Sequence, residues 1–76
     1  MKKYTAEIII RNKDNQSIQT NLPFAYLTMG GARRNAIRMA KLMMQTNKNC
    51  RSGHIELVNI IEVKNGEKKL AGFIAY

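Results

Sequence analysis

Residues 28–48, TMGGARRNAIRMAKLMMQTNK, decide the fold that the sequence predicts. On a helix with about 100° between successive residues, this segment divides into two nearly opposite faces. One face is apolar and consists of Met29, Ala32, Ala36, Met39, Ala40, Met43 and Met44, with Ile37 at its margin. An apolar helix face needs a sheet to cover, and the residues on both sides of this segment have the alternation that forms one.

The opposite face of the same helix carries a polar ladder with i, i+4, i+7 spacing, formed by Arg34, Arg38, Lys41, Gln45 and Lys48. Arg33 and Arg34 lie near the helix N-terminus, where a cation costs about 0.3–1 kcal/mol because of the helix dipole. The segment also contains no acidic residue that could form a stabilising i, i+4 pair. A solvated face that happens to be basic is the alternative, but these two features favour a binding surface.

The charge of the whole chain is concentrated in the same region. The formal net charge is +8 over 76 residues, and no acidic residue occurs between Asp14 and Glu56. Such a field attracts a polyanion, which would be nucleic acid or an acidic protein surface. We therefore predict that an acidic or nucleic-acid-containing partner binds the six cations of this interval, which are Arg33, Arg34, Arg38, Lys41, Lys48 and Arg51.

Length and cysteine content predict a single domain, residues 1–76, in the cytoplasm. A chain of this size supports one hydrophobic core, and 45% hydrophobic residues argue against intrinsic disorder. Cys50 is the sole cysteine, so an intramolecular disulfide is excluded, which fits a reducing compartment. Glu7 interrupts the first apolar run, and we therefore expect neither an export signal nor a membrane span.

Two predicted strand pairs flank the helix. Residues 4–11 alternate, with Tyr4, Ala6, Ile8 and Ile10 on one side, and residues 16–21 form a weaker return strand after a turn at residues 12–15. Residues 54–64 and 67–76 form a second hairpin around Asn65-Gly66, a pair typical of type I′ turns. The predicted fold is α+β with the order β-β-α-β-β, a four-stranded antiparallel sheet with one amphipathic helix packed on one face.

The Asn65-Gly66 turn sets the register of the second hairpin. Glu62 is expected opposite Lys69, Ile61 opposite Leu70, Leu57 opposite Ile74, Ile55 opposite Tyr76, and Asn59 opposite Gly72, which marks a bulge or a point of close approach. This register predicts a buried face of Ile55, Leu57, Ile61, Val63, Leu70, Ile74 and Tyr76. Val58, Ile60 and Phe73, with Ile9 nearby, would then form an apolar strip on the open side. That strip is an interface with a second copy or another partner, or it is ordinary surface scatter, or residues 22–27 cover part of it.

The segment before the helix leaves alternatives open. Phe24 and Tyr26 either fill the space between helix and sheet, which we favour in so small a domain, or stack on bases. Thr28 is a suitable N-cap. Gly30 and Gly31 either permit close packing, which we also favour, or cradle a phosphate on free amides.

No enzyme activity is predicted. Cys50 and His54 are four residues apart, but a nucleophile and base also need an orienting partner and a shaped site. With one Cys and one His in the chain, the ligands of a metal site are missing as well. We expect no catalytic residues, no metal and no cofactor.

The overall pattern resembles the small phage-encoded anti-CRISPR proteins that inhibit multi-subunit CRISPR surveillance complexes. The resemblance lies in the N-terminal strand pair, the helix with Ala36-Ile37-Arg38-Met39-Ala40-Lys41, and the hairpin around Val63-Lys64-Asn65-Gly66. It implies a non-enzymatic phage or mobile-element inhibitor that binds a host nucleic-acid-processing complex in the host cytoplasm. Many such inhibitors are acidic mimics of nucleic acid, whereas this chain is basic.

Two function classes therefore follow from the sequence. The first is an inhibitor that blocks the nucleic-acid site of a host nucleoprotein complex through its basic helix face. The alternative is a small protein that binds DNA or RNA directly, with the same helix against phosphates. The aromatic spacing lacks the signature of an RNA-recognition motif, so sequence-specific RNA reading is not expected.

Overall fold

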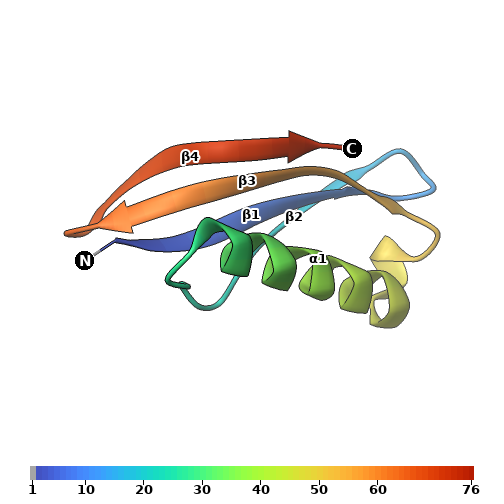
Figure 1. Cartoon of the computed structure of the whole chain (residues 1–76). Helices are drawn as coiled ribbons and strands as arrows, with labels where there is room; N and C mark the ends of the chain where they lie inside the picture. The colour runs from blue at the N-terminus through green and yellow to red at the C-terminus, as the bar shows by residue number, and fades with distance from the viewer. Residues whose placement is uncertain (1) are drawn as a thin grey trace.

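The computed structural model describes residues 2–76 and confirms the predicted α+β fold. Two strands, β1 (Lys3–Arg11) and β2 (Ser17–Asn21), precede the helix α1 (Met29–Thr46). A 3₁₀ turn, η1 (Lys48–Cys50), then leads into β3 (His54–Lys64) and β4 (Glu67–Ala75). All neighbouring strands are antiparallel in the order β2-β1-β3-β4, and α1 lies across one face of the sheet (Figure 1).

The ends of α1 follow from local side chains. The Thr28 hydroxyl accepts a hydrogen bond of 2.9 Å from the backbone N–H of Gly31, which confirms Thr28 as the N-cap. Asn47 ends the helix, and its side chain accepts a bond from the N–H of Asn49 in η1. Lys48 therefore lies in η1 rather than on the helix, so the predicted ladder is one residue too long.

The core is formed where three helix alanines meet two central strands. Ala32, Ala36 and Ala40 are spaced four apart on one face of α1 and are fully buried. Their small side chains let the helix backbone lie close to the sheet. The buried residues that they cover are Ala6, Ile8 and Ile10 of β1 and Val58 and Ile60 of β3, with Leu22 and Cys50 at the edges. The helix methionines Met39, Met43 and Met44 are half-buried around this alanine stripe.

The register of the second hairpin is as predicted only near its turn. Asn65 (φ 52°) and Gly66 (φ 80°) both have the positive φ that a type I′ turn requires, and Glu62 pairs with Lys69. Beyond Ile61 the register shifts by one, because a β-bulge places an additional residue, Ala71, in β4. Leu57 therefore pairs with Ala75 and not with Ile74, and Asn59 pairs with Phe73 and not with Gly72.

The predicted faces of β3 were wrong. Val58 and Ile60, expected on the open side, are 0% and 2% exposed beneath α1, because they pair with Ile8 and Ala6 of β1. Four residues that were expected beneath the helix lie on the open side instead, namely Leu57, Ile61, Val63 and Leu70. Tyr76, also expected to be buried, is 57% exposed. Phe73 is on the open side as predicted, and Ile55 and Ile74 lie on the helix side.

The segment between β2 and α1 agrees with the favoured interpretation at Tyr26, which packs against the core, but not at Phe24. Phe24 is 70% exposed and does not fill the core. Tyr26 is half-buried and forms two backbone hydrogen bonds of 2.7 Å with Tyr4, so this part of the chain continues the sheet edge beside β1. Within residues 2–76, no helix has the length and apolar character needed to cross a membrane.

Candidate functional site

Three cations form a row along the outer side of α1. Arg34, Arg38 and Lys41 are all exposed and lie on the side of the helix opposite the buried Ala36. At 1.5 Å per residue they span about 10 Å of the helix axis. We call these three residues the basic stripe. Its position follows directly from the helix period, because the sheet fixes which side of α1 is buried.

The basic stripe has no counter-charge on its own element, and α1 contains no Asp or Glu along its whole length. Among residues 2–76, the one ion pair joins Arg11 of β1 to Glu56 of β3, on the sheet. The field of the stripe is therefore not cancelled by neighbouring carboxylates, and it is directed away from the core into solvent.

The other predicted binding residues lie around the stripe and not within it. Arg33 is exposed but is rotated by about 100° from Arg34, toward the flank of the helix. Lys48 and Arg51 are exposed in and just after η1, beyond the C-terminal end of α1. The structure thus brings three of the six cations into one row and places the other three beside it or at one end.

Packing explains Gly31, one of the two glycines at the helix start. A Cβ on Gly31 would lie 3.1 Å from the Thr28 hydroxyl oxygen and 3.5 Å from Cβ of Tyr26, so a larger residue would displace the capping hydroxyl by a few tenths of an ångström. The N–H of Gly31 is already bonded to Thr28, and that of Ala32 to the Thr28 carbonyl. These two amides are not available to a phosphate, which agrees with the close-packing interpretation.

Exposed apolar side chains adjoin the N-terminal end of the stripe. Phe24 and Leu27 are each 70% exposed, and Met29 is 40% exposed. Phe24 and Leu27 belong to the loop between β2 and α1, which we call the exposed loop, and Met29 is the first residue of α1, four residues before Arg33. Large apolar side chains next to cations can contact the bases of a nucleic acid or an apolar patch on a protein.

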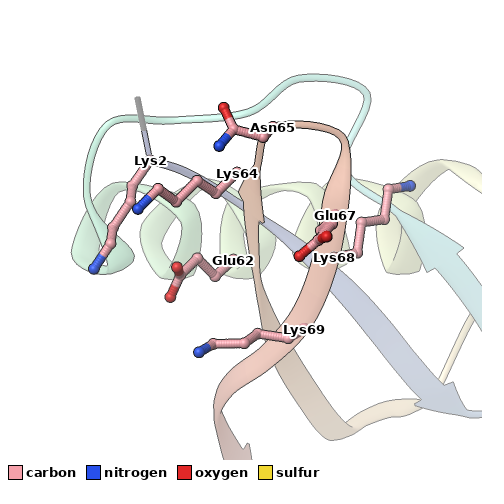
Figure 2. Close-up of a pocket in the computed structure, with 7 residues that line it drawn as sticks. All are labelled: Lys2, Glu62, Lys64, Asn65, Glu67, Lys68 and Lys69. Atoms are coloured by element: carbon pink, nitrogen blue, oxygen red, sulfur yellow. The ribbon is translucent and has the colours of Figure 1, made fainter.

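A second basic region at the tip of the β3–β4 hairpin was not foreseen from the sequence. A hollow of about 430 Å³ is lined by Lys2, Glu62, Lys64, Asn65, Glu67, Lys68 and Lys69. In Figure 2, Lys2 and Lys64 lie together on one side of the hairpin, whereas Lys68 extends away from them. Two carboxylates stand among the four lysines, so the field here is partly cancelled and weaker than that of α1.

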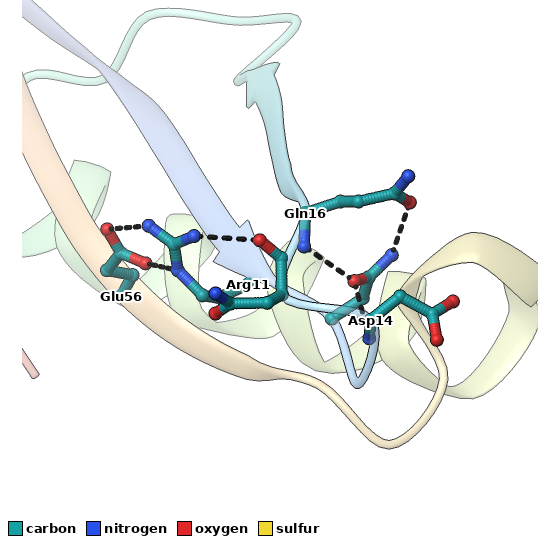
Figure 3. A network of polar contacts seen from close by, with 6 residues as sticks. Arg11, Asp14, Gln16 and Glu56 are labelled. Carbon is teal, nitrogen blue, oxygen red and sulfur yellow. Dashed lines mark hydrogen bonds and ion pairs between the residues drawn. The ribbon is translucent and has the colours of Figure 1, made fainter.

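Polar contacts hold the chain together at the end of the sheet that lies next to η1, away from the tip of the β3–β4 hairpin. Asn12 is 8% exposed, and its side-chain oxygen accepts hydrogen bonds from the N–H groups of Asp14 and Gln16 while its amide donates to the Asn49 carbonyl at 2.9 Å. The Arg11 guanidinium donates to both carboxylate oxygens of Glu56 (Figure 3). These bonds connect β1, the β1–β2 turn, η1 and β3, and they fix the segment that carries Lys48.

The ion pair of this network also shifts two pKa values. The hydrogen bond from Arg11 lowers the pKa of Glu56 below its ordinary value of 4.5, and the same bond raises the pKa of Arg11. Both side chains are about one-third exposed, so solvent weakens the interaction. The pair positions the end of β3 and lies on the sheet, on a different element from the basic stripe.

The Cys50–His54 pair is not arranged for catalysis. Cys50 is fully buried in the core, whereas His54 is exposed at the start of β3. A buried thiol in apolar surroundings is inert, and it is not accessible to a substrate. Residues 2–76 contain no group of three or more His, Cys, Asp or Glu side chains placed to hold a metal ion.

Comparison with models of protein families, with curated protein sequences and with solved structures found no match in any of the three. The resemblance to anti-CRISPR proteins therefore stays a prediction from the sequence pattern. Any function must be argued from the chain's own residues.

Proposed function

We propose that this protein is a non-enzymatic binding module that contacts the phosphates of a nucleic acid through the outer side of α1. The observation that carries the proposal is the basic stripe: Arg34, Arg38 and Lys41 are aligned and exposed on a helix without a single acid. A duplex displays about six phosphates over 10 Å of its axis, so the row faces a dense line of negative charge. Binding of this kind depends on charge and does not select a sequence.

The surrounding cations extend the contact beyond the stripe. Arg33 lies on the flank toward the helix start, and Lys48 and Arg51 continue past its end in the segment fixed by the Asn12 network. The three stripe residues give three contacts, and these three cations raise the number to as many as six. The expected slope of log K against log salt is then about −2.7 to −5.4 for duplex DNA.

The experiment is a titration of a fluorescent random-sequence duplex with the wild-type protein at several salt concentrations. We expect binding that weakens with this slope, little dependence on duplex sequence, and retention on heparin at physiological salt. Binding with a flat salt response would contradict a phosphate contact. No binding to duplex, to single strands or to heparin would contradict the proposal as a whole.

A second candidate is inhibition of a host nucleic-acid-processing complex, as in the anti-CRISPR type. The exposed loop favours it, because Phe24 and Leu27 provide apolar contacts that a nucleic-acid backbone does not use. In this arrangement the basic stripe would occupy the surface where the complex holds its nucleic acid. Capture of a nuclease-resistant protein complex from a bacterial host, lost in a Phe24→Ser variant, would support this function over direct binding.

A further inference from the structure

The face of the sheet opposite α1 is open, and apolar side chains occupy its centre. Residues that pair across an antiparallel sheet point to the same side, so the rows of this face follow from the register. One row joins Thr5, Ile61 and Leu70, the next joins Asn21, Glu7, Asn59 and Phe73, and a third joins Gln19, Ile9, Leu57 and Ala75. Within residues 2–76, no helix covers these rows, since α1 lies on the other side (Figure 1), and the segment before α1 reaches them only at the edge, where the Thr5 hydroxyl donates to the Phe24 carbonyl.

This open face has both a projection and a hollow. Phe73 is 64% exposed and projects from β4. Beside it lies a hollow of about 390 Å³. Its lining consists of Thr5, Glu7, Asn21, Ile61, Lys68 and Leu70 of this face, together with Ala6, Leu22 and Lys69. A surface with both a projection and a depression can pair with itself under a twofold rotation, because each projection can enter the depression of the other copy.

The open face carries charges of both signs, whereas the outer side of α1 carries cations alone, so two copies repel each other less through their open faces. The open face carries cations and acids together: Arg11 is bonded to Glu56 at one end, and Glu7 and Lys68 are both among the residues that line the hollow. The uncancelled cations of α1 lie on the far side of the sheet. Across two stacked sheets, which are about 10 Å apart, the two basic stripes are separated by more than two Debye lengths at physiological salt.

The size of the face matches what a stable dimer needs. The chain measures 39 × 18 × 18 Å, so the sheet presents a footprint of about 700 Å², close to the roughly 800 Å² per partner of a standard interface. The accessible surface is 5189 Å², whereas a folded monomer of 8.7 kDa is expected to expose about 4,700 Å².

We propose that a second copy of this chain docks on the open sheet face, with Phe73 of each copy seated in the hollow beside Ile61 and Leu70 of the other. The resulting dimer is a sandwich of two sheets with the two helices outside. This interface is independent of the phosphate contact, because it uses the opposite side of the molecule.

The test is the molar mass of the wild-type protein and of two matched variants, measured by light scattering and sedimentation from 1 to 500 µM. Phe73→Lys places a charge in the interface, and Leu42→Lys makes the same kind of change at an exposed apolar residue of α1, on the far side of the sheet. We expect a wild-type dimer, an unchanged dimer for Leu42→Lys, and at least a 100-fold weaker dimer for Phe73→Lys. Circular dichroism should show the same secondary structure in all three.

Leu70→Lys provides a second variant, since Leu70 is 56% exposed and lines the hollow. It should weaken the dimer as Phe73→Lys does, and it keeps the test decisive if Phe73→Lys does not fold. A wild-type protein that stays monomeric at 500 µM would overturn the proposal. A dimer that survives both open-face substitutions would overturn it as well, because it would have to form through another surface.

Discussion

Replacing Val58 with alanine should destabilise the protein far more than the same change at Val63. Both valines belong to β3, but Val58 is fully buried beneath α1 while Val63 is half-buried on the open face. Removing two buried methyl groups costs about 1.6 kcal/mol of transfer free energy. The cavity left in a tightly packed core raises the cost of Val58→Ala to about 2–3 kcal/mol, against less than 1 kcal/mol for Val63→Ala.

The assay is urea unfolding followed by circular dichroism, performed in the Phe73→Lys background so that association contributes nothing to the free energy of unfolding. The loss at Val58 corresponds to a fall in Tm of roughly 10–20 °C for a domain of this size. An equal or larger loss for Val63→Ala would refute the reasoning. It would mean that the opposite face of β3 is packed against the helix, because a single slip in register exchanges the two faces.

Two further predictions concern the ion pair between Arg11 and Glu56 and two of the glycines. Glu56→Gln should lower the free energy of unfolding at pH 7. Because the bonded carboxylate has a lowered pKa and stabilises the fold only when ionised, the difference from wild type should disappear as the pH falls below 4.5 and the carboxylate is protonated. Urea titrations of both proteins from pH 7 to pH 3 measure this difference. Gly53→Ala should lower the free energy of unfolding by more than about 1 kcal/mol, since the new Cβ would lie 2.7 Å from the Arg11 carbonyl oxygen. Gly30→Ala creates no contact below 3.4 Å and should raise the free energy of unfolding by about 0.5–1 kcal/mol, because alanine stabilises a helix relative to glycine.

The accuracy of the sequence prediction varied with how clearly each strand distinguishes its two faces. In β1 the apolar residues Ala6, Ile8 and Ile10 alternate with a set that is polar except for Ile9, so the buried side was evident. β3 has large apolar residues at both alternations, and its pattern does not indicate which set is inside. The bulge at Ala71 then shifts the second half of β4. Gly72 indicated an irregularity next to this position, but a glycine does not show whether the strand bulges or which residues then pair.

The candidate site was predictable to the extent that it lies on one element. The positions of Arg34, Arg38 and Lys41 follow from the helix period once Ala36 is known to be buried. Lys48 depends on where the helix ends, which Asn47 decides through its capping bond. The hollow at the hairpin tip depends on residues as far apart as Lys2 and residue 69, which only the tertiary fold brings together.

The measurement that tests the phosphate contact most directly compares two triple charge reversals in duplex binding. Arg34, Arg38 and Lys41 are replaced by Glu in one variant, and Lys13, Lys64 and Lys69, all exposed cations outside α1, are replaced by Glu in the other. Each set changes three charges by two units, so both variants fall from +8 to +2 and feel the same general repulsion. The helix variant should lose nearly all binding at 150 mM salt, and any remaining binding should depend little on salt. The control variant should still bind, with a slope of log K against log salt close to that of wild type. Equal losses in the two variants, with both normally folded by circular dichroism, would contradict the assignment of α1 as the nucleic-acid interface.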